Sequence, residues 1–307
     1  MESTMGSSVG LLGLGIMGSA MSANLLRSGY KVFGFDVLAD RLHALAQAGG
    51  ELARSAREVA ERADIIIAVL PSVAALDAVV SGAEGILASG RKDLILVEAS
   101  TFPIEDKQRV HDLCGRSGVT MLDCPLSGTG AQAVTKDLSV YASGDAQACA
   151  RCAPVFAGFA RSQHYLGEFG NGSKMKFVAN LLVAIHNVSA AEAFVLGMKA
   201  GLDAQMIYDV VGDGAGSSRM FQVRGPLMVR GQYEPATMKV EIWQKDMNII
   251  ADFAARLDCP TPLLAASAAY YTAAMAQGRG GEDTAAVCAV LEQMARLQRG
   301  ASATKSN

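Results

Sequence analysis

A lysine and an asparagine stand four residues apart just past the middle of the chain, directly after a glycine turn. Residues 170–172 read Gly-Asn-Gly, Ser173 follows, and Lys176 and Asn180 open a long apolar run. Gly-x-Gly-Ser is typical of a turn and a helix N-cap, so we expect Ser173 to cap a helix over residues 174–199. Residues four apart share one face of a helix, and a lysine beside an amide there fits an anionic or carbonyl substrate. The alternative is that the lysines of the first turn extend into solvent and Asn180 is a buried amide with a protein partner.

A glycine-rich turn near the N-terminus predicts a dinucleotide site. It follows a short apolar run, precedes a helical pattern, and has the sequence Gly13-Leu14-Gly15-Ile16-Met17-Gly18. A second predicted strand ends in Asp36. In this motif the first glycine allows a tight turn, the second lets the backbone approach a pyrophosphate, and the third lets helix and strand pack closely. Asp36 would accept hydrogen bonds from the ribose hydroxyls; the alternative is a purely structural glycine turn.

Asp36 also bears on the choice of cofactor. A carboxylate at this position repels the 2′-phosphate of NADP, which slightly favours NAD. Arg41, about one turn into the next helix, is within reach of such a phosphate. The prediction is therefore NAD or NADP, with NAD preferred.

Further candidate residues follow other predicted strands. Leu70 ends the apolar run 64–70 and Pro71 follows it, while Thr101 comes shortly after the run 93–97. Ligands bind at the carboxyl edge of an open parallel sheet, so we assign these three residues to the cofactor site. Thr101 has the additional possible role of capping the helix that begins near Pro103.

A second glycine turn follows the predicted strand 119–123. Its residues are Ser127, Gly128 and Thr129. The serine hydroxyl and the next two backbone amides can form a cradle for a carboxylate. A plain polar turn is the alternative.

The order of the elements predicts two domains. Strands and helices alternate through residue 168, and almost only helices follow. This pattern indicates an α/β protein: a Rossmann-type doubly wound domain with a mainly parallel sheet at 1–168, followed by an all-helical domain at 169–307.

Composition narrows the class of protein. The chain has 307 residues, 50% of them apolar and only 19% charged, with a net charge of −3. The absence of a basic run argues against a nucleic-acid partner, and the low charge content favours a buried oligomer interface. The apolar stretch 177–198 is interrupted by Asn180, His186 and Asn187, which argues against a membrane span. Residues 1–8 carry no secretory signal, so we expect a cytoplasmic protein whose six cysteines are free thiols. We interpret the Cys149-x-x-Cys152 pair as ordinary helix packing, and we expect no bound metal.

Three ordered motifs together resemble the β-hydroxyacid dehydrogenase family, the 3-hydroxyisobutyrate dehydrogenase-like enzymes, over nearly the whole chain. The glycine turn at 13–18 is similar to the family's cofactor motif, and residues 123–128 to its substrate motif, Asp-x-Pro-x-Ser-Gly-Gly. Residues 170–180 resemble the catalytic motif, and Lys245 with Asp246 a late Lys-Asp motif whose lysine lies near the cofactor. Thr129 departs from the pattern, because it replaces the second glycine.

The resemblance implies reversible hydride transfer between NAD(P) and a short 3-hydroxy acid or its semialdehyde or keto form. Lys176 would be the general acid/base, Asn180 would orient the lysine or the substrate oxygen, and residues 127–129 would hold the carboxylate. Partial burial and the helix N-terminus would both lower the pKa of Lys176 toward neutral pH. The family also implies a C-terminal domain like that of 6-phosphogluconate dehydrogenase. With the long helix and the low charge content, we predict a homodimer or homotetramer formed mainly through that domain.

Two other functions compete with this prediction. An imine reductase would share the architecture, but such relatives usually carry an acid or a tyrosine where Lys176 stands. A non-catalytic dinucleotide-binding interaction protein would lack the lysine. The lysine therefore favours a dehydrogenase of the EC 1.1.1.- class.

Overall fold

The computed structural model describes residues 8–299, which divide into two compact units. Unit 1 ends at Val178 and unit 2 begins at Ala179. The change of unit falls inside a continuous helix, α8 (Asn171–Lys199). The predicted division after residue 168 lies just before that helix begins.

Unit 1 is built on a six-stranded sheet in the order β3-β2-β1-β4-β5-β6, with every neighbouring pair parallel. Its strands are β1 (Ser8–Leu12), β2 (Lys31–Phe35), β3 (Glu51–Leu52), β4 (Ile65–Ala68), β5 (Ile95–Glu98) and β6 (Thr120–Asp123). The chain builds one half of the sheet from β1 to β3 and then crosses to β4, so the strand order reverses at the point where β1 and β4 lie side by side. This is the strand order of a doubly wound dinucleotide-binding fold, and the prediction of fold class is confirmed.

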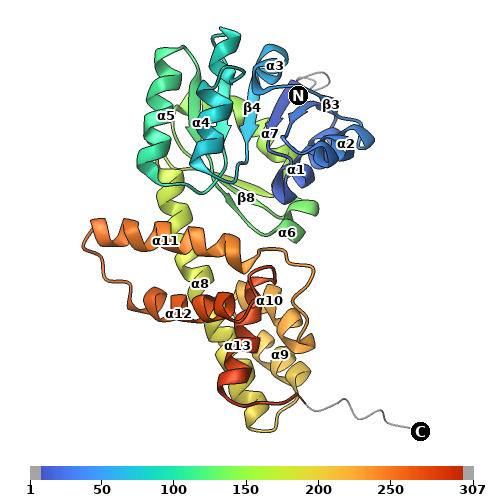
Figure 1. Ribbon diagram of the computed structural model, residues 1–307, viewed down its shortest axis with the longest axis vertical. Helices are drawn as coiled ribbons and strands as arrows, with labels where there is room; N and C mark the ends of the chain where they lie inside the picture. Colours follow the sequence, from blue (N-terminus) through green and yellow to red (C-terminus); the bar gives the residue numbers. More distant parts are fainter. Residues whose placement is uncertain (1–7, 300–307) are drawn as a thin grey trace. The chain divides into compact units, whose positions relative to one another are not determined.

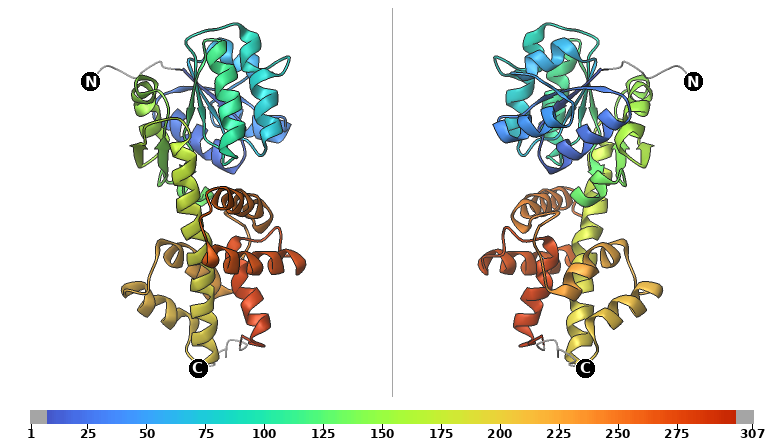
Figure 2. Two further views of the ribbon diagram at one scale, coloured as in Figure 1. Left: turned by 90° about the vertical axis from the view of Figure 1, so that its left-hand side faces the viewer. Right: turned by 90° about the vertical axis from the view of Figure 1, so that its right-hand side faces the viewer.

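Helices cover both faces of this sheet (Figures 1 and 2). They are α1 (Ile16–Arg27), α2 (Ala39–Gln47), α6 (Gly130–Val134) and α7 (Ala146–Phe159) over one face, and α3 (Ala56–Arg62), α4 (Val73–Ser81), η1 (Ile86–Ser89) and α5 (Ile104–Arg116) over the other. Ile66 and Ile67 of β4 are both fully buried, one in each core. Parallel strands covered on both faces need apolar residues at successive positions, which explains the uninterrupted apolar run in the sequence.

A small second sheet continues from the end of β6. It consists of β7 (Leu126–Ser127), β8 (Ser139–Ala142) and β9 (Ser162–Tyr165), with β7 antiparallel and β9 parallel to β8. An isolated antiparallel bridge between Asp123 and Ser143 joins it to β6. The sequence patterns at 138–143 and 161–166 predict two final strands, and both are present as β8 and β9, whereas the two-residue β7 and β3 were not predicted.

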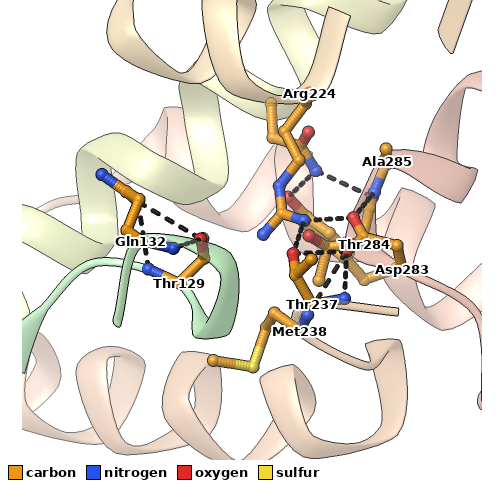
Figure 3. A network of polar contacts seen from close by, with 10 residues as sticks. Thr129, Gln132, Arg224, Thr237, Met238, Asp283, Thr284 and Ala285 are labelled. Carbon is orange, nitrogen blue, oxygen red and sulfur yellow. Dashed lines mark hydrogen bonds and ion pairs between the residues drawn. The ribbon is translucent and has the colours of Figure 1, made fainter. Parts of the chain in front are cut away.

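Unit 2 is helical, as predicted. Besides the rest of α8 it contains α9 (Ala204–Asp213), α10 (Arg219–Arg230), α11 (Val240–Arg256), α12 (Pro262–Ala276), η2 (Thr284–Ala286) and α13 (Val287–Met294). Phe221 stacks between Phe194 and Tyr208 in its core. The buried carboxylate of Asp283 pairs with Arg224 and also accepts bonds from Thr237 (Figure 3). This network ties the chain before α11 to the start of η2.

Helix α8 is the one helix in residues 8–299 that is long and apolar enough to cross a membrane by length and composition. Its buried Asn187 side chain donates to the Tyr271 hydroxyl at 3.0 Å and to the Thr284 carbonyl at 2.8 Å. Such bonds are typical of a helix that packs against other segments of the protein.

Two helix boundaries differ from the sequence predictions. Helix α8 begins at Asn171, and the Lys174 amide already bonds to the Gly170 carbonyl. Ser173 is thus inside the first turn, and the prediction that it is the N-cap was wrong. The helical pattern of residues 283–299 predicts a last helix that reaches Arg299, but α13 ends at Met294, and Arg296 has a positive φ of 50°.

Candidate active site

The first glycine turn connects β1 to α1 at the carboxyl edge of the sheet. Gly13 has a φ of +88°, and a Cβ there would lie 2.2 Å from the Val69 carbonyl oxygen. A Cβ at Gly18 would lie 2.0 Å from the Gly13 carbonyl oxygen, so α1 passes very close to the turn. Both positions require glycine because of contacts within the protein.

Gly15 differs from the other two glycines. The nearest heavy atom to a Cβ at this position would be Arg41 Nη1, at 3.8 Å, so the protein's own packing does not demand glycine here. Gly15 is also the N-cap of α1 and offers no side chain to cap it. The amides at the start of α1, together with the positive end of its dipole, suit a bound pyrophosphate. The turn and helix therefore fit a dinucleotide cofactor.

Asp36 holds the glycine turn in place from the end of β2. Its Oδ2 accepts from the Leu14 amide at 2.7 Å, and its Oδ1 accepts from the Leu38 amide at 2.9 Å. Arg41 Nη1 lies 3.1 Å from Oδ2. Burial alone would raise the pKa of Asp36, but these backbone bonds and Arg41 outweigh it and lower the pKa, so the group is ionised at neutral pH.

The ends of β4 and β5 are joined by a serine that the sequence predictions missed. Ser100 accepts from the Leu70 amide through its Oγ, at 2.8 Å, and stands next to Thr101. The predicted cofactor residues Leu70, Pro71 and Thr101 therefore follow adjacent strands at the carboxyl edge of one sheet. Helix α5 begins at Ile104 with Pro103 as its N-cap, so Thr101 does not cap it.

The second glycine turn carries Ser127 and Gly128 from β7 into α6. Gly128 has a φ of +137°, which a residue with a side chain rarely adopts. Thr129 has an ordinary φ of −97° and forms a capping box with Gln132 (Figure 3). The Thr129 amide donates to Gln132 Oε1 at 3.0 Å, so the predicted cradle keeps the Ser127 hydroxyl and the Gly128 amide but loses the Thr129 amide.

Lys176 reaches this second turn from α8. Its Nζ donates to the Leu126 carbonyl at 2.6 Å, and its side chain is half-buried. Lys174, two residues earlier, is exposed and donates to Asn171. The two neighbouring lysines therefore differ: Lys174 extends into solvent, whereas Lys176 lies beside the segment predicted to hold the substrate.

Asn180 and the late Lys-Asp pair meet within unit 2. Asn180 is 4% exposed, and its Nδ2 donates to Asp246 Oδ2 at 3.1 Å. Lys245, about one-third exposed, forms an ion pair with Asp246 at 3.4 Å. The carboxylate of Asp246 thus links the predicted catalytic amide to the predicted cofactor lysine.

Comparison with known proteins identifies the family. The model for the NAD binding domain of 6-phosphogluconate dehydrogenase matches residues 8–167, and the model described as NAD-binding of NADP-dependent 3-hydroxyisobutyrate dehydrogenase matches residues 170–291. L-threonate dehydrogenase from Cupriavidus necator is 34% identical over 284 residues, which are 92% of this chain and 95% of that protein. The chain belongs to the β-hydroxyacid dehydrogenase family.

Solved structures agree with this assignment. The 3-hydroxyisobutyrate dehydrogenase from Salmonella typhimurium has a TM-score of 0.84 at 31% identity and covers 92% of this chain and 99% of its own. The Mycobacterium tuberculosis 3-hydroxyisobutyrate dehydrogenase, in a structure with L-serine, has a TM-score of 0.82 at 29% identity, with coverage of 94% and 99%. The expected class, an NAD(P)-dependent hydroxyacid dehydrogenase that transfers a hydride, is confirmed at the level of the family.

Unit 1 of this β-hydroxyacid dehydrogenase also contains a buried charge cluster that the sequence predictions did not include. Lys107 of α5 lies between Glu98 and Asp123, at the ends of β5 and β6, and all three side chains have no exposed surface. Burial would lower the pKa of Lys107, but the two carboxylates raise it instead, so the lysine is charged. A pattern search cannot find such a cluster, because its members are separated in sequence and stand inside otherwise ordinary elements.

Proposed function

We propose that this β-hydroxyacid dehydrogenase interconverts a short 3-hydroxy acid and its semialdehyde or keto form, with Lys176 as general acid/base. The observation that carries the proposal is the contact of Lys176 Nζ with the Leu126 carbonyl, which brings the amine beside Ser127 in the substrate motif. A lysine amine can exchange a proton with the hydroxyl or carbonyl oxygen of the substrate without a metal. Proton transfer by such a group contributes about 10²–10⁴-fold to rate.

The contacts of these residues support the following roles. During oxidation the neutral amine of Lys176 takes the proton of the substrate hydroxyl, and during reduction the ammonium returns a proton to the carbonyl oxygen. The Ser127 hydroxyl and the Gly128 amide hold the carboxylate, and Thr129 stabilises the turn through its capping box. Asn180, held by Asp246, orients the lysine or the substrate oxygen.

The cofactor would be held by residues 13–18, Asp36, Leu70, Pro71 and Thr101 of unit 1. Lys245 remains a predicted cofactor residue on the resemblance of Lys245 and Asp246 to the family's late Lys-Asp motif. When bound, its nicotinamide supplies or accepts the hydride. Asp36, ionised and facing the turn, slightly favours NAD, whereas Arg41 beside Gly15 keeps NADP possible. We retain the predicted domains, a dinucleotide-binding domain at 1–168 and a substrate and oligomerisation domain at 169–307, although the substrate turn at 127–129 precedes the boundary and Lys245 follows it.

The position of Lys176 in α8 reduces the expected effect of the helix dipole on its amine. Because the helix begins at Asn171, Lys176 lies beyond its first turn. The positive end of a helix dipole acts mainly within that turn, so its influence on Lys176 is smaller than the sequence implied.

Turnover with a substrate panel tests the proposal. We expect NAD or NADP to be reduced with at least one of L-threonate, 3-hydroxyisobutyrate and L-serine. Lys176→Ala should lower kcat/KM by about 10²–10⁴-fold. Lys174→Ala, on the same helix but exposed, is the matched control and should stay within about two-fold of the parent.

Other outcomes point to the competing functions. Near-full activity of Lys176→Ala would show that the assigned chemistry is wrong. Turnover of a cyclic imine, with none of the hydroxy acids, would indicate an imine reductase. Tight NADH binding without turnover of any compound would indicate a non-catalytic binding protein.

We also propose a cytoplasmic homodimer or homotetramer that associates through unit 2. Leu202, Met206 and Val210 recur at four-residue spacing along α9 and the turn before it, and each is at least half exposed. A second copy of the chain would cover this apolar face. Light scattering tests this, and a stable monomer near 32.0 kDa would contradict it.

A further inference from the structure

Lys107 makes three short contacts inside unit 1 and none of them reaches a proposed substrate or cofactor residue directly. Its Nζ lies 2.7 Å from Asp123 Oδ1, 2.7 Å from the Ser100 carbonyl oxygen and 2.5 Å from Glu98 Oε2. A fully buried lysine held by two hydrogen bonds and a close ion pair has a fixed position.

One side of this cluster leads to the helix that carries Lys176. Asp123 Oδ2 accepts from the Ser173 amide at 2.7 Å, and Asp123 Oδ1 accepts from the Ser173 hydroxyl at 2.8 Å. The Gly172 amide donates to Ser143 Oγ at 2.9 Å, and Ser143 Oγ donates to the Asp123 carbonyl at 3.0 Å. A carboxylate at the positive end of a helix is favourable, so Asp123 acts as an anchor for the start of α8.

The helix leaves little room at this anchor. A Cβ at Gly172 would lie 2.5 Å from both the Asp123 and the Tyr141 carbonyl oxygens. Lys176 follows Ser173 by three residues, so its backbone is about 4.5 Å further along the helix axis. A small displacement at the anchor therefore moves Lys176 by nearly the same amount.

The other side of the cluster leads to the cofactor edge. The Ser100 amide donates to Glu98 Oε1 at 2.9 Å, and Ser100 Oγ accepts from the Leu70 amide. Ser100 precedes Thr101, and Leu70 precedes Pro71, so the loops proposed to contact the cofactor are held by the same group of residues. Lys107 joins the two sides, because it contacts both Ser100 and Asp123.

We infer that Lys107 is a positioning residue, which acts through Asp123 and Ser173 to set Lys176 against the loops at the cofactor edge. The inference rests on the proposed function of Lys176. Replacing a buried ion pair by apolar residues often leaves stability unchanged, so stability alone does not account for a charged cluster here. Directional bonds from one ammonium group, by contrast, fix the register of three elements, and misplacement by about 1 Å can lower a rate by about 10²-fold.

Ser173→Ala is the decisive variant, because it removes the hydroxyl bond to Asp123 and retains the backbone bond. We expect kcat to fall about ten-fold and its pH profile to shift, with KM and the dissociation constant for NADH within about two-fold of the parent. Ser173→Thr keeps a hydroxyl and should restore kcat to within about three-fold. Ser189→Ala, at an exposed serine of the same helix, is the control and should change neither quantity.

Lys107→Met tests the centre of the cluster. If it folds, it should lower kcat at least as much as Ser173→Ala; if it does not fold, the serine variants decide. A normal kcat and pH profile in Ser173→Ala, accompanied only by a lower melting temperature, would overturn the inference and leave the cluster a purely structural feature.

The test separates this inference from the proposed function. Should Lys176→Ala retain activity, the proposed function fails and the positioning role fails with it. Should Lys176→Ala be inactive while Ser173→Ala and Lys107→Met are fully active, only the positioning role fails.

Discussion

Asn180 donates its side-chain amide to the carboxylate of Asp246, with 3.1 Å between Nδ2 and Oδ2 and both side chains buried. The bond fixes which way the Asn180 amide points, so its carbonyl oxygen faces away from Asp246. Asn180 also lies one turn of α8 after Lys176. An oriented acceptor at this position suits an ammonium group or a substrate hydroxyl.

Two asparagines of α8 should therefore respond differently to substitution. Asn180→Ala should lower kcat/KM about 10–100-fold, and it should also cost about 1–3 kcal/mol of stability because the buried Asp246 loses a donor. Asn187→Ala removes bonds to Tyr271 and Thr284 and should cost about 1–3 kcal/mol of stability without lowering kcat. Steady-state kinetics and urea unfolding of both variants check this. Equal effects of the two variants on kcat would contradict the assignment of Asn180.

Arg41 should control the use of NADP. Its guanidinium is 45% exposed, pairs with Asp36 and lies beside Gly15. Arg41→Ala should raise the KM for NADP about ten-fold and change that for NAD less than three-fold, since only NADP carries the 2′-phosphate. Lys31→Ala, at the opposite end of β2, is the control. An equal effect of Arg41→Ala on both cofactors would mean that Arg41 only braces Asp36.

Glu98 should make stability depend on pH. Burial raises the pKa of Glu98 above its ordinary value, although Lys107 and Ser100 oppose the shift. The folded protein then holds this proton at a higher pH than the unfolded chain, whose pKa is about 4.3, so the contribution of Glu98 to stability falls as pH rises through the raised value. Glu98→Gln removes this dependence, so its advantage in urea midpoint over the parent should grow as pH rises above the unfolded pKa of about 4.3. Glu84→Gln, at an exposed glutamate, is the control and should show no such trend. If the urea midpoints of Glu98→Gln and the parent differ by the same amount at every pH, the prediction is wrong.

One thiol should react quickly in the native protein. Cys259 is exposed, whereas Cys114, Cys124, Cys149, Cys152 and Cys288 are buried. Burial raises the pKa of Cys149 to about 11 and of Cys152 to about 12, so neither supplies much thiolate at neutral pH. An aromatic disulfide reagent should modify a single thiol rapidly, and Cys259→Ser should abolish that fast phase. Rapid modification of a second thiol in Cys259→Ser would show that the Cys149-x-x-Cys152 pair is more accessible than its packing indicates.

Local pattern was sufficient for several features of the molecule. The alternation of apolar runs and helical spacing predicted the doubly wound unit and the helical unit, because each run must bury a face of a fixed period. The turn at 13–18 was also recognisable, since Gly13 and Gly18 meet backbone atoms too closely for any side chain. The free thiols, too, followed from the sequence, and the structure confirms all six.

Long-range contacts decided the rest. Asp123 and Ser173 are 50 positions apart, and their bond moves the start of α8 from Ser173 to Asn171, because a carboxylate from β6 replaces a local cap. Asn180 and Asp246 are 66 positions apart. Sequence patterns report what a residue prefers among its neighbours along the chain, but a distant partner can override that preference. Residue types and spacing thus identified the family and the candidate lysine, whereas only the folded chain showed that Lys176 contacts Leu126, that Asn180 contacts Asp246 and that the Lys107 cluster contacts Ser173 through Asp123.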